Sequence, residues 1–222
     1  KPFDNVYYLL PPDRNFAANH RPNSALEPLC YDVFGYPLRE SIDKLDLLFA
    51  GTPDAYDTLD SLIGEIMQGI SGNEAKWRDV QTWNDLLWAK PLFDKDKGTS
   101  LQVGEVKAVS VGRFRRLLRR MVQTRQTGLF VKNRSSDMVS LSERIRGVQA
   151  GQTIVVDIAQ LMDWEQTLVF GDILQTVYRM YAENDEDQPS MPKRTIIFVD
   201  ELNKYAPAGS GQSAILDQIL EV

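Results

Sequence analysis

The 222-residue sequence has few of the residues on which disulfides, most metal sites and His-based catalysis depend. Cys30 is its only cysteine and His20 its only histidine. One cysteine cannot form an internal disulfide, so a reducing, cytoplasmic location fits best. One histidine makes a His-ligated metal site or a Ser-His catalytic pair a poor fit. We expect Cys30 to be a buried structural thiol and His20 to lie in a surface loop.

Long apolar runs and glycine-rich nucleotide loops are also absent. No run approaches the roughly 18 to 20 apolar residues that a membrane helix needs, so we expect no membrane contact. The pattern Gly-x-x-x-x-Gly-Lys-(Ser/Thr), which holds phosphates through backbone N–H groups, occurs nowhere in the chain. No Gly-x-Gly-x-x-Gly follows a strand, which argues against a dinucleotide-binding oxidoreductase. Gly209 to Ser213 is glycine-rich but has no lysine, and we interpret it as a loop.

The net charge of −6 hides a strong local asymmetry. From Gly112 to Arg146 there are ten basic and two acidic residues, so this segment is +8 and the rest of the chain is −14. Local charge decides where a polyanion docks. A helix here would place Arg113, Arg116 and Arg120 on one face. Three interpretations stay open: a solvated face with acidic partners in the chain, an interface between subunits, or contact with DNA phosphates.

The apolar periodicity predicts an α/β fold, with helices on a parallel sheet. Strands are expected at residues 3–10, 31–35, 128–131, 153–158 and 195–200, and helices at 42–50, 53–72, 77–88, 111–126, 142–150 and 163–182. The last two strands are continuous apolar runs joined by a long helix, which is typical of a βαβ unit covered on both faces. Gln166 is expected to complete a capping box at the start of that helix.

The strongest chemical signal is the run from Ile196 to Val199, followed by Asp200 and Glu201. Four apolar residues and two acids are the pattern of a Walker B strand, whose carboxylates emerge at the carboxyl edge of a parallel sheet. Asp200 is then expected to hold Mg²⁺ through its water shell, and Glu201 to polarise the water that attacks the γ-phosphate. The alternative is a buried strand that merely finishes in acids. Asp157 also ends a strand but lacks a second acid, so we interpret it as structural.

Residues 200 to 207 read Asp-Glu-Leu-Asn-Lys-Tyr-Ala-Pro, which resembles the signature of HerA-like P-loop ATPases, relatives of the FtsK DNA pumps. Tyr31–Arg39, Val155–Ala159 and Gln166–Val169 are similar to further motifs of that family, in the same order. The resemblance covers nearly the whole chain. It implies a RecA-like sheet and a homohexameric DNA translocase or helicase that uses ATP and Mg²⁺, often with a partner nuclease or other effector.

Two departures qualify what the resemblance implies. The phosphate-binding loop is missing, and the chain stops at Val222, before the later motifs of the family. We therefore expect the middle of a longer ATPase, inactive by itself. Residues 1–51 would be N-terminal strands and loops of the ATPase region, 52–98 a helical insertion subdomain, and 99–222 the RecA-like βαβ segment with Walker B. The alternative is a non-catalytic oligomerisation or partner-binding module that kept the fold.

Overall fold

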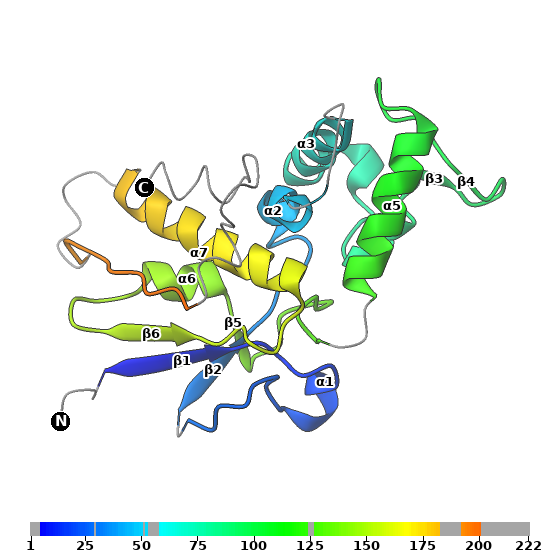
Figure 1. The fold of residues 1–222 in the computed structure, drawn as a ribbon. Helices are drawn as coiled ribbons and strands as arrows, with labels where there is room; N and C mark the ends of the chain where they lie inside the picture. The colour runs from blue at the N-terminus through cyan, green and yellow to red at the C-terminus, as the bar shows by residue number, and fades with distance from the viewer. Residues whose placement is uncertain are drawn as a thin grey trace.

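The computed structural model describes residues 5–28, 30–50, 52, 58–123, 127–182 and 192–200. Within these residues a four-stranded parallel sheet is flanked by helices, so the predicted α/β class is confirmed (Figure 1). Its strands are β1 (Val6–Leu10), β2 (Tyr31–Phe34), β5 (Met138–Val139) and β6 (Thr153–Val156), in the order β5-β2-β1-β6. A separate antiparallel hairpin joins β3 (Phe93–Asp94) to β4 (Thr99–Ser100).

Successive strands are added first on one side of β1 and then on the other. From β1 it proceeds to β2 and β5 on one side, and β6 then returns to the other side of β1, with Tyr8 opposite Val155. Strand β1 ends at Pro11, which has no N–H to donate to a ladder. The carboxyl ends of β1 and β6 therefore form a topological switch point, where open α/β sheets commonly bind ligands.

The helices of the described residues are α1 (Phe16–Asn19), η1 (Ile42–Lys44), α2 (Leu45–Phe49), α3 (Thr58–Ser71), η2 (Ala75–Trp77), α4 (Trp83–Leu87), α5 (Ala108–Val122), α6 (Leu141–Arg146) and α7 (Asp163–Ala182). Helices occur in each predicted range, but α1 and the start of η2 lie outside those ranges, α6 ends earlier than predicted, and residues 77–88 are not one helix. A continuous helix from Trp77 is wrong because Thr82 starts a new one. Its side chain accepts from the Asp85 N–H, and the Asp85 carboxylate accepts from the Thr82 N–H, which closes a capping box.

Helix α7 has the predicted limits, but its cap differs from the prediction. The first helical hydrogen bond runs from the Gln166 N–H to the Met162 carbonyl, which makes Met162 the N-cap. Glu165 is then the third helical residue, and its carboxylate accepts from the Met162 N–H at 2.9 Å. Gln166 instead donates its side-chain amide to the Leu161 carbonyl. The capping role assigned to Gln166 therefore belongs to Glu165.

Two further predictions are wrong. Residues 128–131 form no strand, because their backbone bonds to loops: the Gly128 N–H donates to the Pro12 carbonyl, and the Leu129 carbonyl accepts from Tyr36. Cys30 is exposed, because it lies just before β2, where burial begins only at Val33.

The main hydrophobic core joins the sheet to helices α2 to α7. Phe34, Trp77 and Phe114, from distant parts of the chain, are all fully buried in it. The guanidinium of Arg39, on the loop after β2, donates to the carbonyls of Ile70, Trp77 and Val80, among others, and so fixes the turn after α3. In the described part of the chain, no helix combines the length and the apolar character needed to cross a bilayer.

Candidate functional site

Asp200 lies exposed in a turn at the end of an extended segment, Thr195 to Val199. The prediction that this segment is a buried central strand is wrong, since it pairs with no described strand. Ile196 is 77% exposed and Phe198 91% exposed. Glu201 and the rest of the Asp-Glu-Leu-Asn-Lys-Tyr-Ala-Pro signature lie outside the described residues.

The reason for this difference is that helix α7 covers only one face of the extended segment. Ile197 and Val199 are partly buried and pack against Phe170 and Leu174 of α7. Alternate residues of an extended chain point to opposite sides, so Ile196 and Phe198 face away from the helix. An apolar run alone does not distinguish a strand that is covered on two faces from one that is covered on a single face.

The contacts of the segment show in which direction it leads to Asp200. Close to the C-terminus of α7, the Tyr181 hydroxyl lies 3.1 Å from the Pro192 carbonyl oxygen and 2.6 Å from Thr195 Oγ1. Ile197 and Val199 contact the middle of the same helix, so the segment runs antiparallel to α7 (Figure 1). Asp200 is therefore directed toward the N-terminal end of α7, the end that follows the carboxyl terminus of β6.

Asp157, the residue after β6, is held within the loops of the switch point. Its Oδ2 accepts from the Ser24 hydroxyl at 2.5 Å, and its Oδ1 accepts from the Ala159 N–H at 3.0 Å. Its own N–H donates to the Leu9 carbonyl. These contacts close two loops around the end of the strand and support a structural role for Asp157.

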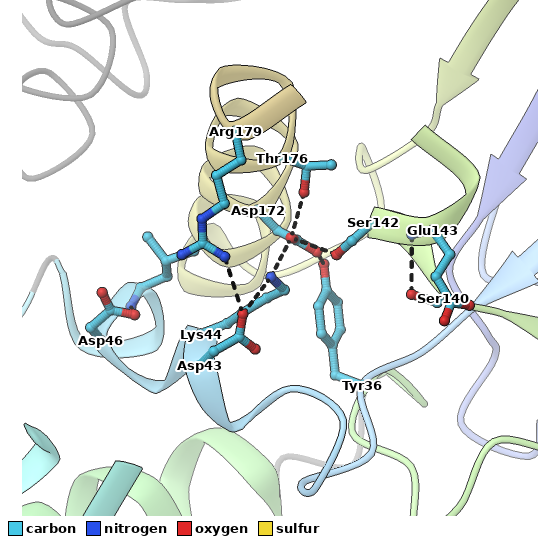
Figure 2. Close-up of polar contacts among 11 residues, drawn as sticks. Tyr36, Asp43, Lys44, Asp46, Ser140, Ser142, Glu143, Asp172, Thr176 and Arg179 are labelled. Atoms are coloured by element: carbon cyan, nitrogen blue, oxygen red, sulfur yellow. Dashed lines mark hydrogen bonds and ion pairs between the residues drawn. The ribbon is translucent and has the colours of Figure 1, made fainter. Parts of the chain in front are cut away.

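A buried polar cluster around Asp172, which the sequence analysis did not find, lies between α7, α6 and η1 (Figure 2). Asp172 has no exposed side-chain surface, and Lys44, 6% exposed, places its ammonium nitrogen 2.8 Å from Asp172 Oδ1. The hydroxyls of Tyr36, Ser142 and Thr176 lie 2.9, 3.0 and 3.2 Å from the same carboxylate. Each of these groups can donate, so the buried charge is compensated as such charges must be.

The charges of the cluster continue to the surface in alternating sign. Lys44 also lies 3.2 Å from Asp43, whose carboxylate is 3.6 Å from the guanidinium of Arg179. Burial, and then the negative charge of Asp172, raises the pKa of the Tyr36 hydroxyl well above its ordinary value. Tyr36 therefore stays protonated and remains a hydrogen-bond donor to Asp172.

A cavity beside this cluster is too small for a nucleotide. Its volume is about 20 Å³, and Gly35, Tyr36, Lys44, Ser140 and Asp172 are among the residues that line it. A single water needs about 10–15 Å³ and several polar partners, so the cavity suits one water molecule. The sequence signal that could have revealed the cluster is the single acid within the apolar stretch Phe170 to Leu174.

The arginines of α5 differ in their surroundings. Arg115 is fixed by the fold: its guanidinium donates to the Leu87 carbonyl and to the Ser100 hydroxyl, and it lies over the rings of Phe93 and Trp88. Burial, and then the nearby charge of Arg119, lowers the pKa of Arg115 from its ordinary value.

Other arginines of α5 line an open hollow of about 340 Å³, whose described lining residues are Arg116, Arg119, Arg120 and Gln123. All four are exposed, and we refer to them as the arginine hollow. Arg113 is half-buried and does not line it. Of the three arginines predicted to share one face, Arg116 and Arg120 thus line the hollow and Arg113 does not.

Among the described residues, no three His, Cys, Asp or Glu side chains gather as a metal site. Asp200, the predicted Mg²⁺ ligand, therefore belongs to no such group in the described part of the chain. No family model matches the chain, and a search of curated proteins finds no match.

Proposed function

We propose that the chain is part of an ATP-hydrolysing motor of the HerA type, which moves DNA or activates a partner nuclease or effector. The proposal includes a RecA-like core, with residues 52–98 as a helical insertion, assembly into a homohexamer, and a cytoplasmic location. Its basis in the sequence is the signature from Asp200 to Pro207. The observation that supports it is the course of the extended segment, which runs back along α7 toward the N-terminal half of that helix before it reaches Asp200.

The surroundings of Asp200 suit the role proposed for it. Within the described residues its carboxylate is exposed and has no hydrogen-bond or ion-pair partner, so it is available to the water shell of a cation. Mg²⁺ retains several waters and takes one or two carboxylates. When bound with ATP, Mg²⁺ neutralises charge that develops on the phosphates. Glu201, the next residue, would orient the attacking water and accept its proton.

The proposal is tested by Mg²⁺-dependent ATP binding in a protein that joins this chain to a phosphate-binding loop. Asp200→Asn removes the charge and keeps the shape, so we expect it to weaken ATP binding in the presence of Mg²⁺ and not in its absence. The exposed loop residue Asp96 provides the matched control, and Asp96→Asn should change neither measurement. Equal affinities of Asp200→Asn and the wild type in titration calorimetry with Mg²⁺ would contradict the assignment.

A second candidate, a non-catalytic oligomerisation or partner-binding module, is favoured by the exposure of Ile196 and Phe198. Large exposed apolar side chains that lie together commonly mark a contact surface. The two candidates differ in one measurable property, since the module needs no Mg-ATP. If the protein forms its oligomer or binds its partner and yet has no affinity for Mg-ATP, the module is favoured.

A further inference from the structure

The arginine hollow has the geometry of an anion site. Arg116 and Arg120 are four residues apart on α5, as are Arg119 and Gln123, so the four side chains mark the corners of one helix face. The Arg119 guanidinium donates from Nε to Gln123 Oε1 at 3.1 Å, which leaves its terminal nitrogens for another acceptor. Like charges at this spacing repel one another, and an anion bound between them removes that repulsion.

Arg116 and Arg119 differ from Arg115 in how they contact the rest of the fold. Arg115 bonds to Leu87 and Ser100 and stacks on Phe93, so it fixes α5 to the neighbouring hairpin. Arg116 makes no ion pair with any described residue, and within the described part of the chain the Arg119 side chain hydrogen-bonds to Gln123 of the same helix. These two guanidiniums are therefore available to a partner without cost to the packing of the fold.

The composition of the lining favours phosphate groups over a protein surface. Protein interfaces have an apolar, desolvated centre and a polar rim, whereas no apolar side chain is among the described residues that line the hollow. The planar fork of arginine matches two phosphate oxygens at once. Several guanidiniums on adjacent turns of a helix suit successive phosphates of a polymer, and such contacts need no base recognition.

We propose that the arginine hollow binds the phosphate backbone of a nucleic acid, with Arg116 and Arg119 as the principal contacts. This inference rests on the proposed function for the role of the nucleic acid as cargo, but the binding itself requires no ATP. The proposed phosphate-binding residues differ from the predicted face of Arg113, Arg116 and Arg120. Arg113 is excluded, and Arg119 and Gln123 are added.

The test is the salt dependence of duplex binding, measured without nucleotide by fluorescence anisotropy with a labelled DNA duplex. The double variant Arg116→Gln/Arg119→Gln should bind more weakly, with a slope of log K against log salt that is about two units shallower between about 50 and 200 mM salt. Arg78→Gln/Arg146→Gln is the matched control, because it removes two exposed arginines elsewhere. It should keep the wild-type slope. Thermal unfolding checks that both variants fold.

Three results would overturn the proposal: no duplex binding by the wild type, a wild-type slope for the hollow variant, or equal loss in both variants. If the hollow variant changes only the sedimentation of the protein, the hollow binds an acidic surface of a second copy. The Asp200→Asn calorimetry is independent of this test. The calorimetry can therefore contradict the motor assignment while the salt dependence supports DNA binding by the arginine hollow, and the reverse can also occur.

Discussion

At the scale of single residues, Asp172 carries a carboxylate that the fold removes entirely from water. Lys44 supplies the opposite charge, and three hydroxyls supply further donors (Figure 2). Charges buried this deeply cost several kcal/mol each to desolvate, and the pair is stable only while both partners are present. The loss of one partner should therefore cost much more than the loss of an exposed ion pair.

We predict that Lys44→Met lowers the free energy of unfolding by about 3 kcal/mol or more, because it leaves Asp172 charged and buried. Lys76→Met is the control, since Lys76 is 47% exposed where it pairs with Glu65, and its loss should cost about 1 kcal/mol or less. Urea unfolding measures both values. Equal costs for the two variants would show that Asp172 is not held as a buried charge.

The sequence indicates a role for Asp200 but not the partners of Asp172, for a physical reason. Asp200 follows an apolar run and begins a motif, so its signal is local. Asp172 acquires its role from Tyr36 and Lys44, which lie more than a hundred positions away, and no local spacing reports such contacts. The prediction that Cys30 is buried is wrong for a similar reason. Its apolar neighbours predicted burial, but its position before β2 leaves it exposed.

At the scale of elements, helix α7 organises the part of the fold that the proposed site needs. It packs against α2 and α6 and supports the segment that leads to Asp200. Its N-terminus depends on Glu165, which is 1% exposed and accepts from the Thr127 hydroxyl and the Met162 N–H. Burial outweighs these hydrogen bonds and raises the pKa of the Glu165 carboxyl above its ordinary 4.5.

This raised pKa predicts how stability changes with pH. Above the ordinary carboxyl value of 4.5 the unfolded chain has lost the Glu165 proton while the folded chain still holds it, so stability falls as the pH rises through this window. Glu165→Gln cannot titrate. The stability of the wild type relative to this variant should therefore decrease as the pH rises from about 4.5, and level off above the folded pKa.

Urea unfolding over this pH range measures the difference. Glu105 is exposed, so the wild type compared with Glu105→Gln should show no such decrease. A difference between the wild type and Glu165→Gln that stays constant, or that grows with pH, would contradict the burial of a titrating Glu165.

Most elements could be predicted because their patterns are local. The limits of α7 and the positions of β1, β2 and β6 follow from apolar periodicity and from Pro11. The short helix α4 and strand β5 could not be predicted in this way. Strand β5 has two residues and is defined by its pairing with β2, while α4 begins where the Thr82 and Asp85 side chains close a cap. The limits of β5 are thus set by a tertiary contact and the start of α4 by a local cap, and apolar periodicity reports neither.

At the scale of the whole molecule, the parallel sheet and its switch point agree with a nucleotide-binding α/β protein, while the predicted central position of the 195–200 segment does not. Its uncovered face, with Ile196 and Phe198, differs from the buried strand that the sequence predicts. The sequence predicts the class of fold because alternating strands and helices specify it. It does not predict how many layers cover each strand.

The most direct test of the proposed motor is ATP turnover in a protein that joins this chain to a phosphate-binding loop. Glu201→Gln keeps the shape of the side chain but cannot accept a proton. Turnover should fall by about 100-fold or more, the contribution usual for a general base, while Mg-ATP stays bound. Glu105→Gln should leave turnover unchanged. A Glu201→Gln rate above about a tenth of the wild-type rate would contradict the assignment of Glu201 as the catalytic base.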